Sequence, residues 1–234
     1  MNASPDLSAG VHPATDLAEA GYDAKEDNYY AHQRPEMQAL VPQSARRLLE
    51  VGCGGGIFAA SLKAKRDIHV TGIEAFAEAA AQAAGRIDRV IAAGIEAALP
   101  QLAEERFDCI VINDVLEHLV DPWEVLRQLR PLLNVDGVLV ASIPNARYLP
   151  VFKDYVLRGQ WQYQLEGVLD RTHLRFFTRR SMQAMFEAAG YTMVSIQGIH
   201  PVQVSWKFKL LNALFKDAFS DMPYLQFASV VRPA

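Results

Sequence analysis

The chain has 234 residues, of which half are hydrophobic, and its formal net charge is −4 at pH 7. This acidic balance argues against nucleic acid as the main partner, because phosphate binding needs a basic field. No run approaches the roughly 20 apolar residues of a transmembrane helix, and Met1–Gly10 lacks the basic start and apolar core of a signal peptide. We therefore expect one cytoplasmic domain with a substantial core.

Two segments precede the first predicted strand. Residues 1–27 have little periodicity and scattered Pro, Ser, Asp and Gly, so we expect this N-terminal segment to be partly mobile. An aromatic and basic cluster follows at Asn28–Glu36, and it contains Tyr30 and Arg34. The folded domain is therefore predicted to cover residues 28–234.

Apolar runs alternate with helix-like segments along the domain, a pattern typical of parallel strands covered on both faces. The predicted strands are Arg47–Val51, His69–Ile73, Arg89–Ala93, Cys109–Asn113, Val138–Ile143, Tyr191–Gln197 and Leu225–Val231. Helices are predicted at Phe76–Ala84, from Asp121 onward with Pro122 in the first turn, and from Thr178 to Gly190. The expected fold is a doubly wound, Rossmann-like α/β fold with a mostly parallel seven-stranded sheet.

A glycine loop follows the first strand, in the stretch Leu48–Gly56. Glycine tolerates positive φ and has no Cβ, so a turn built from Gly52, Gly54, Gly55 and Gly56 lets a nucleoside lie against bare backbone. The dinucleotide fingerprint G-x-G-x-x-G needs a glycine where this chain has Ile57. The spacing therefore favours a sulfonium nucleoside over a pyrophosphate, with a glycine turn that holds no ligand as the alternative.

Acidic residues lie at the tips of the first two strands. Glu50 is near the end of the first strand, and Glu74 follows the second. A carboxylate at the second position is well placed to accept both ribose hydroxyls. The alternative for Glu74 is a helix-start carboxylate favoured by the helix dipole.

This combination resembles the class I S-adenosylmethionine-dependent methyltransferases. In that family Glu50, Gly52, Gly54 and Gly56 form the first motif and Glu74 is the ribose acid, while Phe107–Pro122 resembles the segment that lines the methionine side of the cofactor. The resemblance implies S-adenosyl-L-methionine as cofactor and S-adenosyl-L-homocysteine as product. The further cofactor contacts that it implies are Cys53, Ala75, Ile95, Glu96, Asn113, Asp114 and Val115. Tyr30 and Arg34 are expected to meet the cofactor carboxylate, and the alternative for both is packing on the surface.

One departure from the family concerns the adenine. The family often has Gly-Asp-x-Glu after the third strand, whereas this chain reads Ala93-Gly94-Ile95-Glu96. Gly94 thus replaces the acid that faces the adenine amine, so that contact must come from backbone, Glu96 or water.

The family usually ends its sheet with an antiparallel strand pair, and two insertions are expected on the substrate side. The first, 145–177, is rich in aromatic and basic residues, which argues for order, and its Leu169–Phe177 resembles a motif of bacterial methyltransferases encoded with glycosyltransferases. That resemblance implies a sugar, a glycan-linked or another small-molecule acceptor.

The second insertion, 198–223, spaces Val204, Phe208, Leu211 and Phe215 as in an amphipathic helix. The interpretations are a helix packed on its own domain, a lid, or a peripheral membrane contact. The sequence does not indicate an oligomeric state.

The chemistry expected is an in-line displacement at the sulfonium methyl, with O-methylation of a sugar hydroxyl or phenol requiring a base. The candidates are His118, after the fourth strand, and His173 with Asp170 as its orienting carboxylate. Adjacent helical residues do not share a face, so we expect one of Glu117 and His118 to point into the site and the other away. The alternative for His118 is a histidine that packs beside the cofactor or caps the strand end. The alternative for the second pair is a local salt bridge between Asp170 and Arg171, with His173 filling a pocket in the loop.

Cys53 and Cys109 have no metal-ligand spacing, so we expect reduced thiols and no metal site. Two other classes of function stay open. One is a non-catalytic nucleoside-binding regulatory or partner protein with the same fold. The other is a nicotinamide-dependent oxidoreductase, which Ile57 and the lack of a recognisable hydride site count against.

Overall fold

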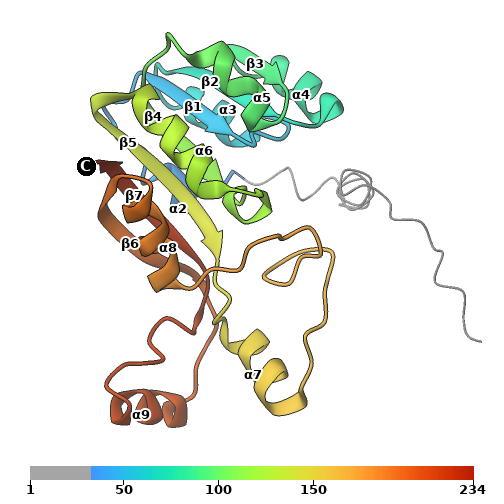
Figure 1. The fold of residues 1–234 in the computed structure, drawn as a ribbon, viewed down its shortest axis with the longest axis vertical. Helices are drawn as coiled ribbons and strands as arrows, with labels where there is room; N and C mark the ends of the chain where they lie inside the picture. Colours follow the sequence, from blue (N-terminus) through green and yellow to red (C-terminus); the bar gives the residue numbers. More distant parts are fainter. Residues whose placement is uncertain (1–32) are drawn as a thin grey trace, which may run out of the picture.

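A computed structural model describes residues 33–234, so residues 1–27 and Tyr30 lie outside the described part. Its centre is a seven-stranded sheet in the order β3-β2-β1-β4-β5-β7-β6 (Figure 1). The strands are β1 Arg47–Val51, β2 His69–Glu74, β3 Arg89–Ala92, β4 Phe107–Asn113, β5 Leu133–Pro144, β6 Tyr191–Pro201 and β7 Tyr224–Pro233. The first five are mutually parallel, and β7 runs antiparallel to β5 and β6. The predicted fold class is confirmed.

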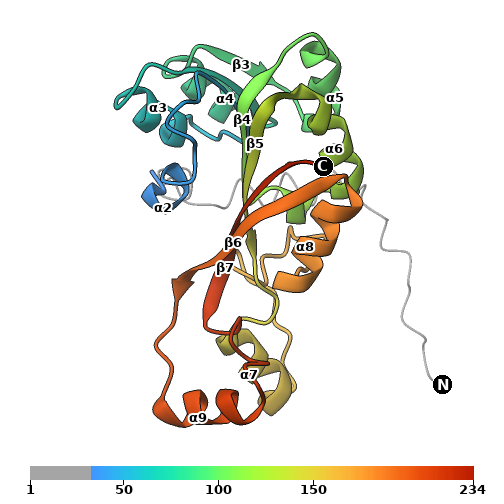
Figure 2. The same cartoon turned by 90° about the vertical axis from the view of Figure 1, so that its left-hand side faces the viewer.

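Helices cover both faces of the sheet (Figure 2). They are α2 Pro35–Gln38, α3 Ile57–Lys63, α4 Ala77–Ala84, α5 Ile95–Ala98, α6 Pro122–Leu129, α7 Leu149–Arg158, α8 Arg179–Ala188 and α9 Trp206–Leu214. One core cluster packs α5, α6 and α8 on one face, and a second packs α2, α3 and α4 on the other. Strands buried on both faces explain why the sequence shows continuous apolar runs rather than alternation.

The helix starts follow the capping chemistry of the sequence. Asp121 accepts a hydrogen bond from the backbone N–H of Glu124 at 2.9 Å, and Pro122 occupies the first turn of α6. Thr178 forms a reciprocal capping pair with Ser181 at the start of α8. These contacts set the entry of the two helices that buttress the second half of the sheet.

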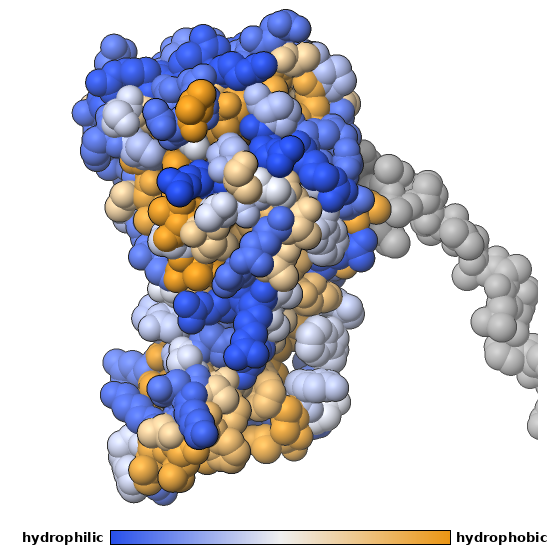
Figure 3. Space-filling model, turned by 60° about the vertical axis from the view of Figure 1, so that its left-hand side comes forward, coloured by the Kyte–Doolittle hydropathy of each residue, from blue (hydrophilic) through white to orange (hydrophobic). Residues whose placement is uncertain are grey.

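The helices of the two insertions, α7 and α9, lie at the same end of the molecule, beyond the sheet (Figures 1 and 2). The prediction that the second insertion packs its apolar stripe on the domain is wrong, because α9 has no buried residue. Trp206, Leu210, Leu211 and Leu214 are all exposed. Figure 3 shows apolar side chains gathered at this end.

No helix among residues 33–234 is both long and apolar enough to cross a membrane.

Candidate active site

The carboxyl ends of the parallel strands meet along one edge of the sheet. Val51 of β1 pairs with Ile73 of β2 and with Ile112 of β4, so the three strands end level with one another. The residues that follow, namely Gly52, Glu74 and Asn113, therefore emerge at the same edge. This is where ligands bind in open α/β sheets.

The glycine loop turns as the sequence predicts. Gly52, Gly54 and Gly56 all have positive φ, at 71°, 50° and 77°. A Cβ on Gly52 would run into the side chain of Val115, so glycine lets the two segments close on each other. Side chains are thereby kept off the surface that a nucleoside would occupy.

Not every predicted contact in this region faces the loop surface. The Cys53 thiol is buried against Gly72 of β2, and burial raises its pKa, so only the Cys53 backbone is available to a ligand. Ile95 is likewise buried in the core, which limits it to backbone contact. Ala75 is exposed at the strand end, and Glu96 is exposed in α5, whose N-cap is Gly94.

Two carboxyl groups make this edge electrostatically suited to a cation. Glu50 is 3% exposed, and its Oε2 has no hydrogen-bond partner among the described residues. Burial raises the pKa of Glu50 to about 8, with the Glu74 charge adding to the shift. A buried acid of this kind is stabilised as a carboxylate when a positive ligand group approaches.

Glu74 holds the loop and keeps its carboxylate at the strand tip. Its Oε2 accepts from the Gly54 N–H at 2.7 Å and its Oε1 accepts from the Phe76 N–H at 3.0 Å. Burial raises its pKa despite these hydrogen bonds. Each carboxylate oxygen can accept a further bond, so Glu74, which holds the backbone just before α4, keeps acceptor capacity for a ligand.

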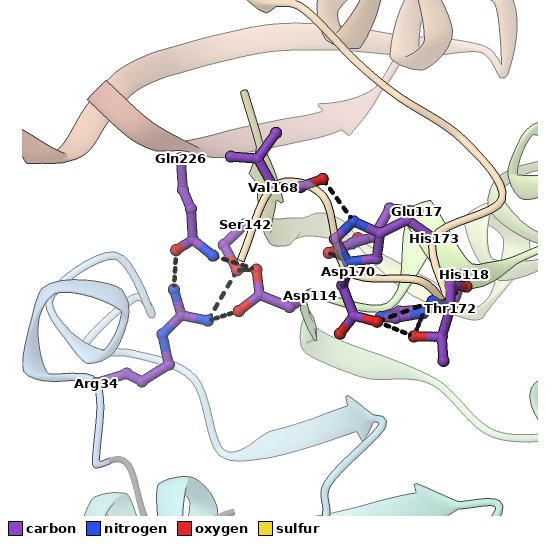
Figure 4. Close-up of polar contacts among 10 residues, drawn as sticks. All are labelled: Arg34, Asp114, Glu117, His118, Ser142, Val168, Asp170, Thr172, His173 and Gln226. Atoms are coloured by element: carbon purple, nitrogen blue, oxygen red, sulfur yellow. Dashed lines mark hydrogen bonds and ion pairs between the residues drawn. The ribbon is translucent and has the colours of Figure 1, made fainter. Parts of the chain in front are cut away.

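Arg34 and Asp114 form the centre of a polar network (Figure 4). Arg34 donates to Asp114 at 2.5 Å, to Ser142 at 3.0 Å and to Gln226 at 2.9 Å. Gln226 and Ser142 each donate to Asp114 Oδ1 in turn. Arg34 is thus not a residue of surface packing, and it contacts a predicted cofactor residue.

Both residues of this pair also have an uncommon backbone conformation, which they share with His200, Lys216 and Asp217 among the described residues. Arg34 and Asp114 have positive φ values of 46° and 54°. Non-glycine residues in this region carry strain that the surrounding contacts must offset, and such strain concentrates at functional sites. Next to Asp114, the Oδ1 of Asn113 is buried with no hydrogen-bond partner among the described residues.

Glu117, His118 and His173 converge beside this network. One nitrogen or oxygen atom from each lies within 4.8 Å of those of the other two, and the two imidazole rings meet edge-on with centroids 4.7 Å apart. Nε2 of His173 is 3.9 Å from Oε1 of Glu117, whose side chain is 1% exposed. The insertion thus brings His173 to a turn that follows β4.

One expectation about this cluster is corrected. Glu117 and His118 lie in a three-residue 3-10 turn, Leu116–His118, and both reach the cluster instead of facing opposite ways. The Nδ1 of His173 faces the Val168 carbonyl at 3.1 Å, and Oδ1 of Asp170 accepts from the hydroxyl of Thr172 at 2.6 Å. Asp170 thus holds the loop segment that contacts His118, and its role as the orienting carboxylate of His173 stays a prediction.

Three residues of the site were not predicted from the sequence, namely Glu117, Ser142 and Gln226. Glu117 was considered only as the neighbour of His118, with one of the two expected to face the site. Ser142 has a recoverable signal, because it pairs with Asn113 across β4 and β5. Gln226 lies on β7, and no local pattern links it to Asp114.

A small cavity of about 70 Å³ joins the two halves of the site. It is lined by Asp114, Glu117, Asp170, His173 and Gln226 among others. A larger hollow of about 690 Å³ lies at the opposite edge, where His69 begins β2 and Arg89 begins β3. The amino ends of parallel strands are not where such sheets bind ligands, so we place the site at the smaller cavity.

Comparison with known proteins agrees with this geometry. A family model described as a methyltransferase domain matches residues 22–196. The ubiquinone biosynthesis O-methyltransferase of Aeromonas salmonicida is 30% identical over 173 residues, covering 70% of this chain and 71% of that protein. Its namesake from Cereibacter sphaeroides is 30% identical over 185 residues, covering 75% and 72%.

Solved structures share the fold. A SAM-dependent methyltransferase from Archaeoglobus fulgidus superposes with a TM-score of 0.65 at 18% identity, covering 93% of this chain and 98% of that one. The plantazolicin methyltransferase BamL, crystallised with S-adenosylhomocysteine, gives 0.62 at 17% identity, covering 94% and 91%. With its family, fold and strand-edge site in agreement, the chain belongs to the class I S-adenosylmethionine-dependent methyltransferases, and S-adenosylmethionine is its cofactor.

Proposed function

We propose that this methyltransferase transfers a methyl group to a hydroxyl oxygen of a ring-shaped small molecule. The observation that carries the proposal is the shared cavity, because Asp114, predicted to contact the cofactor, and the base candidates Asp170 and His173 line the same space. A methyl donor and an oxygen acceptor need this adjacency. The curated relatives named O-methyltransferases support oxygen as the atom methylated.

The strand edge supplies complementary contacts for each part of the cofactor. The loop with Gly52, Gly54 and Gly56 offers bare backbone for the nucleoside, and Glu74 offers acceptors for the ribose hydroxyls. Glu50, buried and with one oxygen unpartnered among the described residues, suits the positive charge of the methionine moiety. This arrangement directs the sulfonium methyl toward the cavity.

Arg34 and Asp114 then serve the methionine end. In the structure they form an ion pair with each other, and both are hydrogen-bonded to the neutral amide of Gln226. The cofactor carries both a carboxylate and an ammonium group. The carboxylate can pair with Arg34 and the ammonium with Asp114, so the two residues exchange each other for the cofactor as partner. We infer that the ion pair reorganises when the cofactor binds.

The reaction proposed is a displacement in which the acceptor oxygen bonds to the methyl carbon as the carbon–sulfur bond breaks. The bonding electrons stay on sulfur, which leaves as neutral S-adenosylhomocysteine. Alignment of oxygen, methyl and sulfur contributes on the order of 7–11 kcal/mol, as for other well-oriented reactions. The hydroxyl proton must also leave, and we propose that His118 or His173 receives it, with Asp170 positioning Thr172, which contacts His118.

A row of aromatic rings supports a ring-shaped acceptor. It runs outward from His173 through Phe176, Trp161 and Tyr155, with successive centroid distances of 6.3, 5.4 and 5.8 Å. Phenols and sugars both pack against aromatic faces, so the row fits either class. The Leu169–Phe177 motif favours sugars, and the relatives named for ubiquinone biosynthesis favour other acceptors.

We further propose that the exposed end bearing α7 and α9 lies against an anionic membrane surface. The free thiols of Cys53 and Cys109 support a cytoplasmic location for the protein. Trp206, Leu210 and Leu214 are exposed, and the two insertions carry eight Lys and Arg against five Asp and Glu in a chain with net charge −4. Interfacial helices combine aromatic and lysine side chains in this way. Sedimentation with vesicles containing an anionic lipid should retain the protein, and a Trp206→Ala, Leu214→Ala variant should lose most of that binding.

The experiment that tests the proposed function measures binding first and transfer second. Calorimetric titration with S-adenosylmethionine and, separately, with NAD should give micromolar binding of the former alone. Release of S-adenosylhomocysteine is then screened over phenols and nucleotide sugars. Turnover with an oxygen acceptor supports the proposal, and turnover only with amines would overturn it.

A further inference from the structure

The cluster of Glu117, His118 and His173 has the composition and spacing of a metal site. One atom from each residue lies within 4.8 Å of the others, and the Nε2 of His173 is 3.9 Å from Oε1 of Glu117. Two ligands of a tetrahedral cation with bonds of about 2.1 Å sit about 3.4 Å apart. Small side-chain rotations would therefore bring all three onto one ion.

The surroundings of the imidazoles are those of metal ligands. The Nδ1 of His118 lies 3.1 Å from the Thr172 carbonyl, and the Nδ1 of His173 lies 3.1 Å from the Val168 carbonyl. A neutral imidazole that donates from Nδ1 carries its lone pair on Nε2, the atom that binds a cation. Metal-ligating histidines almost always have such a carbonyl or carboxylate partner on the other nitrogen.

The segment that supplies these carbonyls is itself held in place. Oδ1 of Asp170 accepts from both the N–H and the hydroxyl of Thr172, at 2.8 and 2.6 Å. The backbone N–H groups of Leu174 and Arg175 donate to the Glu117 carbonyl. The loop and the turn after β4 are thus fastened to each other, which keeps the backbone segments that carry the three side chains close together before any ion binds.

A single general base needs one imidazole, whereas this site aims two imidazoles and a buried carboxylate at one point. We propose that Glu117, His118 and His173 bind a divalent transition-metal cation. Imidazole ligands favour ions such as Zn²⁺ and Co²⁺ over Mg²⁺ and Ca²⁺, which prefer oxygen. The absence of a metal site was predicted from the spacing of the two cysteines alone, which carries no information on a site built from histidine and glutamate side chains.

The cation would act on the acceptor. Three protein ligands leave a coordination position open, and Glu117 and His173 line the cavity in which the acceptor is placed, so this role rests on the proposed function. A cation there would lower the pKa of the acceptor hydroxyl that it contacts. With the ion bound, both imidazoles are ligands and the hydroxyl proton leaves to water, so this inference replaces the general-base step proposed above.

Cobalt titration of tag-free protein, dialysed first against a chelator, tests the proposal. We expect one equivalent of Co²⁺ to bind with visible absorption of a four- or five-coordinate ion, and Zn²⁺ to displace it. His173→Ala and Glu117→Gln should each weaken binding about 10- to 100-fold. His69→Ala, at the opposite edge of the sheet, should bind as wild type.

S-adenosylmethionine binding serves as the folding control for each variant. Absence of the cobalt spectrum, or equal binding by His173→Ala, would overturn the metal proposal. Methyl transfer that proceeds at full rate in chelator would also overturn it and leave the proposed function intact. Cobalt binding without methyl transfer to any oxygen acceptor would instead count against the proposed function.

Discussion

Glu50→Gln tests the electrostatics of the strand edge. Glu50 is 3% exposed, and burial raises its pKa from 4.5 to about 8. Between these values the folded protein keeps a proton that the unfolded chain has released. The free energy of unfolding therefore falls as pH rises, by about 1.4 kcal/mol per pH unit from this group alone.

Glutamine keeps the shape of the side chain and removes the titration. Urea unfolding of both proteins at several pH values gives the difference directly. From about pH 5.5 to about pH 7.5 the wild type should lose roughly 2–3 kcal/mol more than Glu50→Gln. Glu96→Gln, which changes an exposed carboxyl of α5, should follow the wild type. Parallel profiles for wild type and Glu50→Gln would refute the reasoning.

The same carboxyl links protonation to cofactor binding. A positive group placed beside Glu50 favours its charged form, so S-adenosylmethionine should expel a proton near neutral pH. Calorimetry in buffers of different ionisation enthalpy measures that proton. Glu50→Gln should bind without releasing it, and proton release that persists in this variant would assign the titration to another group.

Three further variants test the site. Gly54→Val puts a β-branched side chain at a φ of 50° and should abolish S-adenosylmethionine binding in calorimetry, whereas Gly85→Val, at a φ of −80°, should bind normally. Glu74→Gln cannot accept on both oxygens and should raise the Kd about 10- to 100-fold, so an unchanged Kd would remove it from the ribose site. His173→Ala should leave the Kd within about twofold and lower turnover about 100-fold, with His69→Ala as control; equal turnover would exclude His173 from the chemistry.

The central sheet was predictable because its signals are local. Continuous apolar runs define parallel strands, and an acid after one strand and glycines after another fall at the same edge once the strands align. The strand Arg47–Val51 matches its prediction at both ends. β5 begins at Leu133, five residues before the prediction, because its first part contains polar residues and the exposed Val135.

The acceptor side was less predictable because its contacts join distant segments. Gln226 meets Asp114 across 112 positions, and His173 meets Glu117 through a loop without periodicity. Asp170 lines the same cavity as His173, and its contact with Thr172 was not predicted. The exposure of α9 was not predicted, since an amphipathic pattern does not say which surface its apolar face meets.

Transfer of a carbon-13 methyl group tests the central claim most directly. Wild-type protein and Gly54→Val are incubated with S-adenosylmethionine labelled at the methyl carbon and with the acceptor found by screening, and the product is examined by NMR. The account predicts a labelled methyl bonded to oxygen with wild type and no labelled product with the variant. A methyl bonded to nitrogen or carbon, or equal labelling by Gly54→Val, would contradict it.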